Sequence, residues 1–133
     1  MTSAKNGAVL YALNLDRMTA FYRDTMALAV THTEAGVVVL DSDGMQLVLH
    51  AIPPAIAATI VIADPPVARE DASVKLCFFV ASLADARAAA AASGGRFQPA
   101  SNEWEWRGFR ACDGVDPEGN VVQIRTTDRT MRL

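Results

Sequence analysis

The sequence predicts a mixed α+β fold built from two copies of one β-α-β-β-β module. A short pattern occurs twice, as Asp41-Ser42-Asp43-Gly44 and as Asp116-Pro117-Glu118-Gly119, and each copy precedes a short apolar strand. The two copies lie 75 positions apart, and two apolar runs upstream of them, which end at Asn14 and Ser82, lie 68 positions apart. Such a fixed offset is typical of a duplicated supersecondary unit. Two copies that face each other can build one shared pocket.

The chain length suits a single domain over residues 1–133. A hydrophobic content of 51% with 20% charged residues is typical of a globular protein. Four prolines in the middle of the chain indicate a stiff linker that cannot join a central strand, and we expect it to cover the pocket or an interface. The predicted boundaries are 7–52 for the first module, 53–72 for the linker and 73–127 for the second module.

The first module begins with an apolar run from Gly7 to Leu13, which favours a buried strand. Asn14 is a typical helix N-cap, and the apolar residues from Leu15 to Met26 recur at steps of three and four on one helical face. Strand-like segments follow at 28–34, 37–42 and 45–52.

The second module repeats this order. The segment from Ser73 to Ala81 has the composition of a strand. Ser82 begins an alanine-rich helix, and Gly94-Gly95 ends it. The remaining predicted strands are 96–98, a longer one at 103–113, and 119–127.

Charge and hydropathy exclude several classes of partner. A net charge of −3 without a basic run offers no attraction for nucleic acid or an anionic membrane. The N-terminus lacks the profile of a signal peptide, and no apolar stretch is long enough to span a bilayer. We therefore expect a cytoplasmic protein whose Cys77 and Cys112 are reduced and behave as small buried hydrophobes.

Two segments resemble signature stretches of a known family. The first runs from Asn14 to Asp24 and contains Leu15 followed by Phe21-Tyr22, and the second runs from Asp116 to Ile124. Together with the repeat, they resemble the vicinal oxygen chelate superfamily, the glyoxalase/bleomycin resistance/dioxygenase proteins. The resemblance implies two curved mixed sheets of four strands each, whose concave faces enclose a cavity. It implies that the first strand of each module pairs with the fourth, and that the protein forms a homodimer.

The resemblance also sets expectations for the turns and the cysteines. In that topology Cys77 and Cys112 lie on strands separated by a third, too far apart to bridge at about 4.8 Å per strand. The family usually has glycine after the first helix, where this chain has Ala27. Since a left-handed alanine costs about 1 kcal/mol, we expect a slightly rearranged turn there. In the repeated turns we expect acidic side chains to bond backbone amides, and Gly44 and Gly119 to take positive φ.

Metal-dependent members of this family place His, Glu or Gln at the start of each first strand and midway along each fourth. There these residues hold a divalent ion that polarises a substrate oxygen. Counted from the matched motifs, the positions are Gly7, Val48, Lys75 and Gln123. The first two offer no donor and a cationic lysine repels a metal, so we expect no metal and no cofactor. His50, two residues beyond Val48, is the group from which a displaced site could be built.

A ligand pocket is predicted from strand alternation. Across residues 103–113, alternation puts Trp104, Trp106, Arg110 and Cys112 on one face, which suits a flat or cationic organic ligand. The alternative is that one tryptophan packs on the helix side or at a dimer interface. Adding polar groups from the first and fourth strands gives the usual make-up of a small-molecule site. The predicted ligand-binding residues are Tyr11, His50, Lys75, Trp104, Trp106, Arg110, Gln123 and Arg125.

The sequence therefore predicts a glyoxalase/bleomycin-resistance-like protein that binds a small organic ligand and lacks the usual metal ligands. The alternative is an enzyme of the same superfamily, lyase- or dioxygenase-like. Such an enzyme would use a displaced metal site, or Lys75, His50 or Cys112 in metal-free acid–base chemistry. A third interpretation, a regulatory or protein-interaction role, rests on the proline-rich linker.

Overall fold

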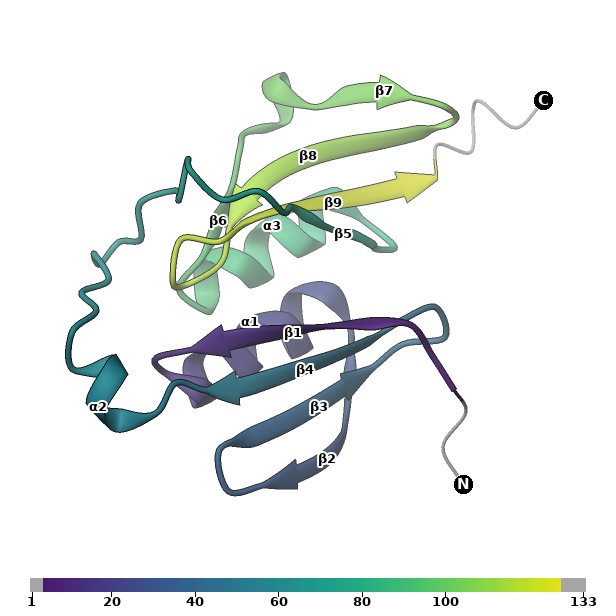
Figure 1. The fold of residues 1–133 in the computed structure, drawn as a ribbon. Coiled ribbons are helices and arrows are strands. Elements are labelled where there is room, and N and C mark those ends of the chain that lie inside the picture. Colours follow the sequence, from purple (N-terminus) through teal and green to yellow (C-terminus); the bar gives the residue numbers. More distant parts are fainter. Residues whose placement is uncertain (1–3, 128–133) are drawn as a thin grey trace.

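The computed structural model describes residues 4–127, and the two modules follow each other in the predicted β-α-β-β-β order (Figure 1). The first module consists of β1 (Gly7–Ala12), α1 (Leu15–Met26), β2 (Ala29–Glu34), β3 (Val37–Asp41) and β4 (Gln46–Ala51). The linker carries the short helix α2 (Pro54–Ala57). The second module consists of β5 (Leu76–Phe79), α3 (Leu83–Ala92), β6 (Arg96–Phe97), a 3₁₀ turn (Ala100–Asn102), β7 (Trp104–Trp106), β8 (Phe109–Val115) and β9 (Val121–Thr127).

Each module forms its own mixed sheet. The first sheet has the order β1-β4-β3-β2, and the second has the order β5-β9-β8-β6 with β7 added beside β8. In both, the first strand pairs in parallel with the module's last strand, as Val9 with Val48 and Cys77 with Gln123. These pairings confirm the predicted α+β fold class and module topology. The second sheet has five strands instead of the expected four because of β7. Cys77 on β5 and Cys112 on β8 are free and separated by β9, as expected.

The predicted long strand over residues 103–113 is wrong, because the chain reverses within it. Arg107 and Gly108 both have positive φ, at 50° and 85°, and join β7 to β8 as an antiparallel hairpin. The apolar–polar alternation continues through this two-residue turn, so the alternation alone could not reveal it. Because Glu105 pairs with Arg110 across the hairpin, the arginine lies on the opposite face from Trp106. The predicted common face is therefore wrong for Arg110 and Cys112.

Local capping signals are confirmed at both helix starts. The Asn14 side chain accepts a hydrogen bond from the Arg17 amide at 3.0 Å, and Ser82 accepts one from the Asp85 amide at 3.1 Å. At the end of α1, the expected rearranged turn is wrong. Ala27 keeps the left-handed conformation, with φ 53° and ψ 39°.

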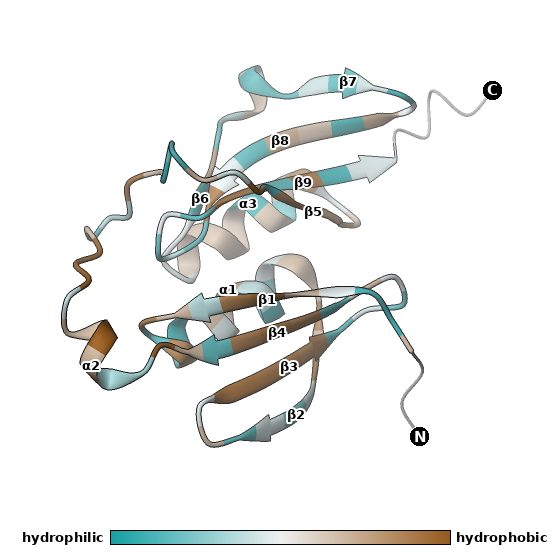
Figure 2. Cartoon of the chain, in the orientation of Figure 1, coloured by the Kyte–Doolittle hydropathy of each residue, from teal (hydrophilic) through white to brown (hydrophobic). Residues whose placement is uncertain are grey.

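Helices α1 and α3 pack against each other and cover one face of each sheet. In Figure 1 the strands lie in front of both helices, so the uncovered faces, here called the open faces, are turned to the same side of the molecule. Figure 2 shows that β3 and the middle of β4 are strongly apolar. Contacts between rings join the modules inside the core, with Phe21 and Phe97 stacked at 6.4 Å and Tyr22 at 5.7 Å from Phe78. The largest fully buried side chains include Tyr22, Phe21, Met18, Leu40, Leu47, Leu49, Ile124 and Val122.

The two sheets adjoin along their edge strands β1 and β5. A cleft of about 470 Å³ lies between these edges, lined in part by Val9, by Leu76 and by the end of the linker at 71–74. The linker therefore borders the space between the modules. Within the described part of the chain, no helix is long and apolar enough to cross a membrane.

Candidate functional site on the open face of the second sheet

A row of polar side chains crosses the open face of the second sheet. Lys75 Nζ lies 3.0 Å from Asp113 Oδ2, and Gln123 Nε2 donates to Asp113 Oδ1 at 3.1 Å. Arg125 Nε then donates to Gln123 Oε1 at 2.5 Å. The strand register produces this row, since Asp113 lies directly opposite Gln123 and the arginine follows two residues later on the same face. Three residues predicted from the sequence, Lys75, Gln123 and Arg125, are thus brought together by Asp113.

Aromatic rings continue this row towards the end of the sheet. Phe109 makes edge-to-face contacts with Phe79 at 5.6 Å and with Trp106 at 5.4 Å between ring centroids. The Arg125 guanidinium lies 4.6 Å from the Phe109 centroid and 5.9 Å from that of Trp106. Phe79 is 62% exposed and Trp106 is 52% exposed. Such an arrangement presents stacking surface and fixed hydrogen-bond donors to the solvent.

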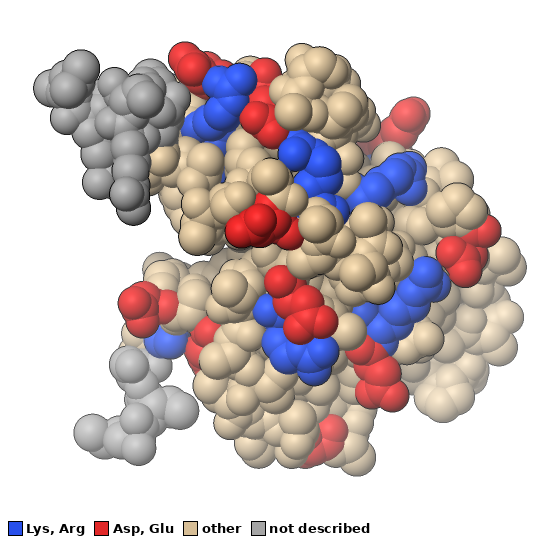
Figure 3. All heavy atoms as spheres, turned by 180° about the vertical axis from the view of Figure 1, so that it is seen from behind, with Lys and Arg blue, Asp and Glu red and all other residues tan. Residues whose placement is uncertain are grey.

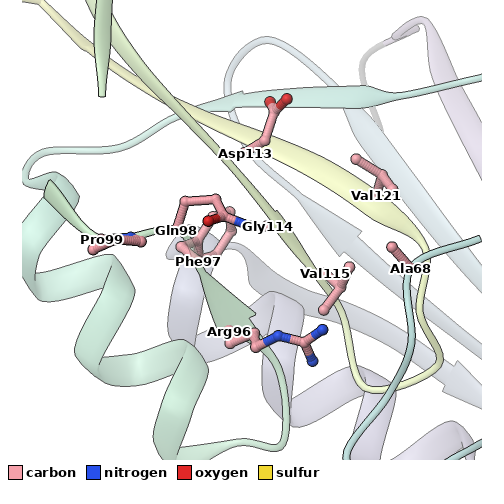
Figure 4. Close-up of a pocket in the computed structure, with 9 residues that line it drawn as sticks. All are labelled: Ala68, Arg96, Phe97, Gln98, Pro99, Asp113, Gly114, Val115 and Val121. Carbon is pink, nitrogen blue, oxygen red and sulfur yellow. The ribbon is translucent and has the colours of Figure 1, made fainter. Parts of the chain in front are cut away.

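A small cavity adjoins the polar row at Asp113. It has a volume of about 280 Å³ and lies between β6, β8 and the linker (Figure 4). Figure 4 shows Phe97 and Gln98 on one side of the cavity and Val121 and Ala68 on the other. The open face therefore offers a hollow at one end and aromatic rings at the other, joined by hydrogen-bonded polar groups.

Two predicted site residues lie on the other sheet. Tyr11 and His50 are register partners of β1 and β4, and their ring centroids are 5.6 Å apart. Tyr11 is 61% exposed, and His50 Nδ1 lies 2.8 Å from the Ala51 carbonyl oxygen. Among residues 4–127, no hydrogen bond or ring contact connects this pair with the polar row on the second sheet.

Arg110 and Cys112 lie on the helix side of the second sheet. Arg110 Nε is 2.9 Å from Glu103 Oε1, and Arg110 Nη1 is 2.9 Å from Glu105 Oε1. Glu103 also pairs with Arg87 from α3. The Cys112 thiol is buried beneath this network, and burial raises its pKa. A buried thiol with a raised pKa makes a poor nucleophile or base, so Cys112 does not serve the open face.

The positions that hold metal in metal-dependent members of the family that the sequence resembles do not fit a divalent ion here. A Cβ atom on Gly7 would lie 2.0 Å from the Gln46 carbonyl oxygen, so a ligand side chain cannot stand there without displacing β4. Val48 has no donor atom, and Lys75 is held in an ion pair with Asp113. Within the described residues, no three His, Cys, Asp or Glu side chains converge on a possible metal site.

Sequence reasoning missed three members of this surface, namely Asp113, Phe79 and Phe109. Phe79 shares a strand face with Lys75 by alternation, a signal that could have found it. Simple alternation along 103–113 puts Phe109 and Asp113 opposite the face of Trp106, and only the hairpin turn brings them to the same face. Trp104 occupies the same face of β7 as Trp106, as the alternation predicted, and it is partly exposed.

Comparison with solved structures shows the same fold. A glyoxalase/bleomycin resistance protein/dioxygenase family enzyme from Burkholderia phytofirmans PsJN superposes with a TM-score of 0.68 at 17% identity, covering 94% of this chain and 100% of that one. A glyoxalase/bleomycin resistance protein from Albidiferax ferrireducens T118 gives a TM-score of 0.63 at 15% identity, with coverage of 92% and 98%.

The fosfomycin resistance protein FosX from Listeria monocytogenes gives a TM-score of 0.63 at 14% identity and is covered completely, as is this chain. At these identities the similarity establishes the fold alone. No protein of curated function matches the chain significantly. The family model described as a glyoxalase-like domain matches residues 7–125. The chain therefore belongs to the glyoxalase-like family, as the repeated turns and the helix motif predicted.

Proposed function

We propose that this protein binds a small organic molecule on the open face of the second sheet, without the metal of metal-dependent family members. The observation that carries the proposal is the set of exposed rings of Phe79 and Trp106 beside the hydrogen-bonded row of Asp113, Gln123 and Arg125. Exposed aromatic side chains held rigidly by neighbouring rings provide contact area at little entropic cost. The polar row supplies the few directed hydrogen bonds that orient a ligand.

The chemistry of the chain supports a metal-free site. Gly7 and Val48 provide no ligand atoms, and Lys75 brings a positive charge to the place where a cation would bind. Two of the structural relatives are named for resistance to bleomycin or fosfomycin, both small molecules, which is consistent with a ligand of this class.

A metal-free enzyme is the alternative, and one contact favours it. Lys75 and Asp113 form a partly exposed acid–base pair at 3.0 Å, next to the cavity of Figure 4. In such an enzyme the lysine would donate a proton to a bound ligand or the carboxylate would accept one. His50 lies on the other sheet, where it is the register partner of Tyr11. A second enzyme alternative is a lyase- or dioxygenase-like protein that uses a displaced metal site.

The binding proposal can be tested by thermal unfolding of protein purified without chelators. Wild-type protein is screened with a panel of aromatic antibiotics, including bleomycin, and glutathione thioethers. We expect at least one compound to raise the Tm, and the double variant F79A/W106A to lose that shift. Val61, an exposed linker residue, gives the matched control, because V61A removes apolar surface of similar kind away from the site.

Three outcomes would redirect the proposal. An equal Tm shift in wild type and F79A/W106A would place the ligand elsewhere. A stoichiometric divalent ion in the purified protein would favour the enzyme with a displaced metal site. Stabilisation by a glutathione thioether together with its turnover would favour a glyoxalase-like reaction, and loss of that turnover in K75A would assign the lysine to it.

The homodimer and the cytoplasmic location predicted from the sequence remain part of the proposal. The exposed rings on both open faces form an apolar surface that a second copy of the chain could cover. Tyr11 on the first sheet and Trp106 on the second are exposed aromatic residues of this surface. Sedimentation equilibrium of wild type and the Y11A/W106A variant measures the dimer directly. A monomeric wild-type protein at micromolar concentration would contradict it.

A further inference from the structure

Two arginines approach the same indole ring on the open face of the second sheet. The Arg107 guanidinium carbon lies 5.6 Å from the Trp106 ring centroid, and that of Arg125 lies 5.9 Å from it. The positive φ of Arg107 in the hairpin turn and the cross-strand position of Arg125 bring these cations to one ring. Both distances are within the range of a cation–π interaction. The ring therefore gathers two like charges on one small surface.

Neither guanidinium has a carboxylate partner within the described residues. Four other arginines do, since each pairs with an Asp or Glu side chain: Arg17, Arg23, Arg87 and Arg110. Among the described residues, Glu105, two positions before Arg107, pairs with Arg110 on the helix side, and Asp113, the carboxylate of the polar row, pairs with Lys75. An arginine held by aromatic contacts but without a counter-charge keeps its N–H donors available for an oxyanion.

The open face of the second sheet therefore carries an excess of positive charge. Within residues 4–127, its cations are Lys75, Arg107 and Arg125 and its one carboxylate is Asp113, which leaves two positive charges without a counter-charge among these residues. The whole chain, by contrast, has a net charge of −3. On the helix side, Figure 3 shows acidic and basic side chains interspersed. The positive region is thus local to the proposed binding surface.

We infer that the ligand of this surface is an organic anion, an inference that rests on the binding function proposed above. Its carboxylate, phosphate or sulfonate group binds the guanidinium groups of Arg125 and Arg107. Its carbon skeleton lies against the exposed rings of Phe79 and Trp106. The aromatic contacts and the hydrogen bond to Gln123 hold Arg125 in place before the ligand arrives, which lowers the entropic cost of binding.

The charge can be measured without knowing the ligand, because both tryptophans of the chain lie on β7. In the W104F variant, Trp106 alone fluoresces, and its quenching by iodide, caesium and acrylamide is compared at constant ionic strength. We expect iodide to quench far better than caesium. Each of R107Q and R125Q should lower the ratio of the iodide quenching constant to the caesium quenching constant by about two- to threefold. This is the effect expected from removing one charge roughly 6 Å from the indole ring.

The control is R17Q, which removes the same charge from α1 on the helix side and should leave the ratio unchanged. Acrylamide, which is neutral, checks that the substitutions do not alter the exposure of the ring. Two results would overturn the inference. One is equal quenching by iodide and caesium when the arginines are intact, and the other is a preference for iodide that is unchanged in the R107Q/R125Q double variant.

The ligand chemistry is tested with 1-naphthoate and its neutral isostere 1-naphthamide by isothermal titration calorimetry. We expect the acid to bind about tenfold more tightly, and the preference to disappear in R107Q/R125Q, because charge-assisted hydrogen bonds to the carboxylate are lost. Inorganic phosphate serves as a probe of the anion subsite alone. Its competition with naphthoate would place the anionic group on the two arginines.

The possible failures are distinguishable. Equal binding of acid and amide, both abolished in F79A/W106A, would overturn the anion inference and leave the binding function standing. Binding of neither compound, together with no Tm shift from any compound of the panel, would overturn both. Naphthoate binding that is unchanged in F79A/W106A but lost in R107Q/R125Q would support the anion subsite and contradict the aromatic part of the proposed function.

Discussion

The turn at Asp116–Gly119 is buried between the two modules, whereas its counterpart at Asp41–Gly44 lies at the surface of the first module. The Asp116 carboxylate accepts hydrogen bonds from the Tyr22 hydroxyl at 2.7 Å and from the Glu118 amide at 2.9 Å. The Asp41 carboxylate instead accepts from Thr31 and Lys5, within its own module or just before it. The same sequence pattern thus forms an inter-module contact in one place and a local one in the other.

The third position of the turn explains much of this difference. Glu118 reaches across to the start of α1, where its two carboxylate oxygens accept from the amides of Leu13 and Asn14, both at 2.9 Å. These amides belong to the residue after β1 and to the N-cap of α1, so a negative charge there is also favoured by the helix dipole. Asp43, the shorter acidic residue in the first copy, is exposed. A duplicated motif can therefore keep its pattern while only one copy acquires a role in joining the modules.

The glycines of the two turns differ in the same way. Gly119 has φ 86°, and a Cβ atom there would lie 2.2 Å from the Val67 carbonyl oxygen in the linker. Gly44 does not have positive φ, and no atom lies within 4 Å of the position of its missing Cβ. The prediction of positive φ is thus confirmed for the second turn and wrong for the first. Only the buried turn needs glycine for both conformation and space.

The largest expected effect comes from exchanging these glycines for alanine. G119A should lower the free energy of unfolding by about 3 kcal/mol, because a left-handed alanine and a clash with fixed backbone each cost roughly 1–3 kcal/mol. G44A, the matched control, should change it by less than about 0.5 kcal/mol. Urea unfolding of both variants measures the difference. Equal losses would show that the two turns are under the same constraint.

The repeat and the helix caps could be predicted because they depend on neighbouring residues. Asn14 and Ser82 bond amides three residues away, and the strands follow from short apolar runs. The environment of Gly44 and Gly119 could not be predicted, because it depends on whether the distant linker packs against the turn.

The residues of the candidate site likewise divide into those that the sequence could predict and those that it could not. Lys75, Gln123 and Arg125 follow from alternation within single strands, whereas the position of Arg110 depended on a two-residue turn that alternation does not reveal. Phe79 could have been found in the same way from its spacing to Lys75, whereas Asp113 and Phe109 required knowledge of which strands are neighbours.

The two aspartates should respond to pH with opposite sign. Burial raises the pKa of Asp116 even though it accepts several hydrogen bonds, whereas the hydrogen bond from Thr31, with help from Lys5, lowers the pKa of Asp41. A raised pKa means that the folded state binds the proton more tightly. The contribution of Asp116 to stability is therefore complete below the unfolded-state pKa, about 3.9, and is lost as pH rises through the folded-state value. For Asp41 the contribution is present above about 3.9 and is lost as pH falls through its lowered value.

Urea unfolding between pH 3 and pH 7 tests this contrast. The stability advantage of wild type over D116N should shrink as the pH rises, and its advantage over D41N should grow. Each asparagine variant is the same size as the residue that it replaces and does not titrate, so the difference isolates one carboxyl group. Slopes of the same sign for both pairs would contradict the assignment of Asp116 as the desolvated member.

The smallest expected effect concerns the helix ends, where the modules differ once more. Helix α3 is followed by Gly94 with φ 91°, whereas α1 is followed by Ala27 with φ 53°. A left-handed L-residue costs about 1–2 kcal/mol, and the greater freedom of unfolded glycine offsets about 0.5–1 kcal/mol of that gain. A27G should therefore stabilise the protein by about 0.5–1 kcal/mol, which corresponds to a rise in Tm of roughly 2–4 °C. The reciprocal G94A should lower the Tm, since its Cβ would also lie 2.6 Å from the Arg17 guanidinium. If A27G lowered the Tm instead, Ala27 would have to make packing contacts in the folded state whose loss outweighs the relief of backbone strain.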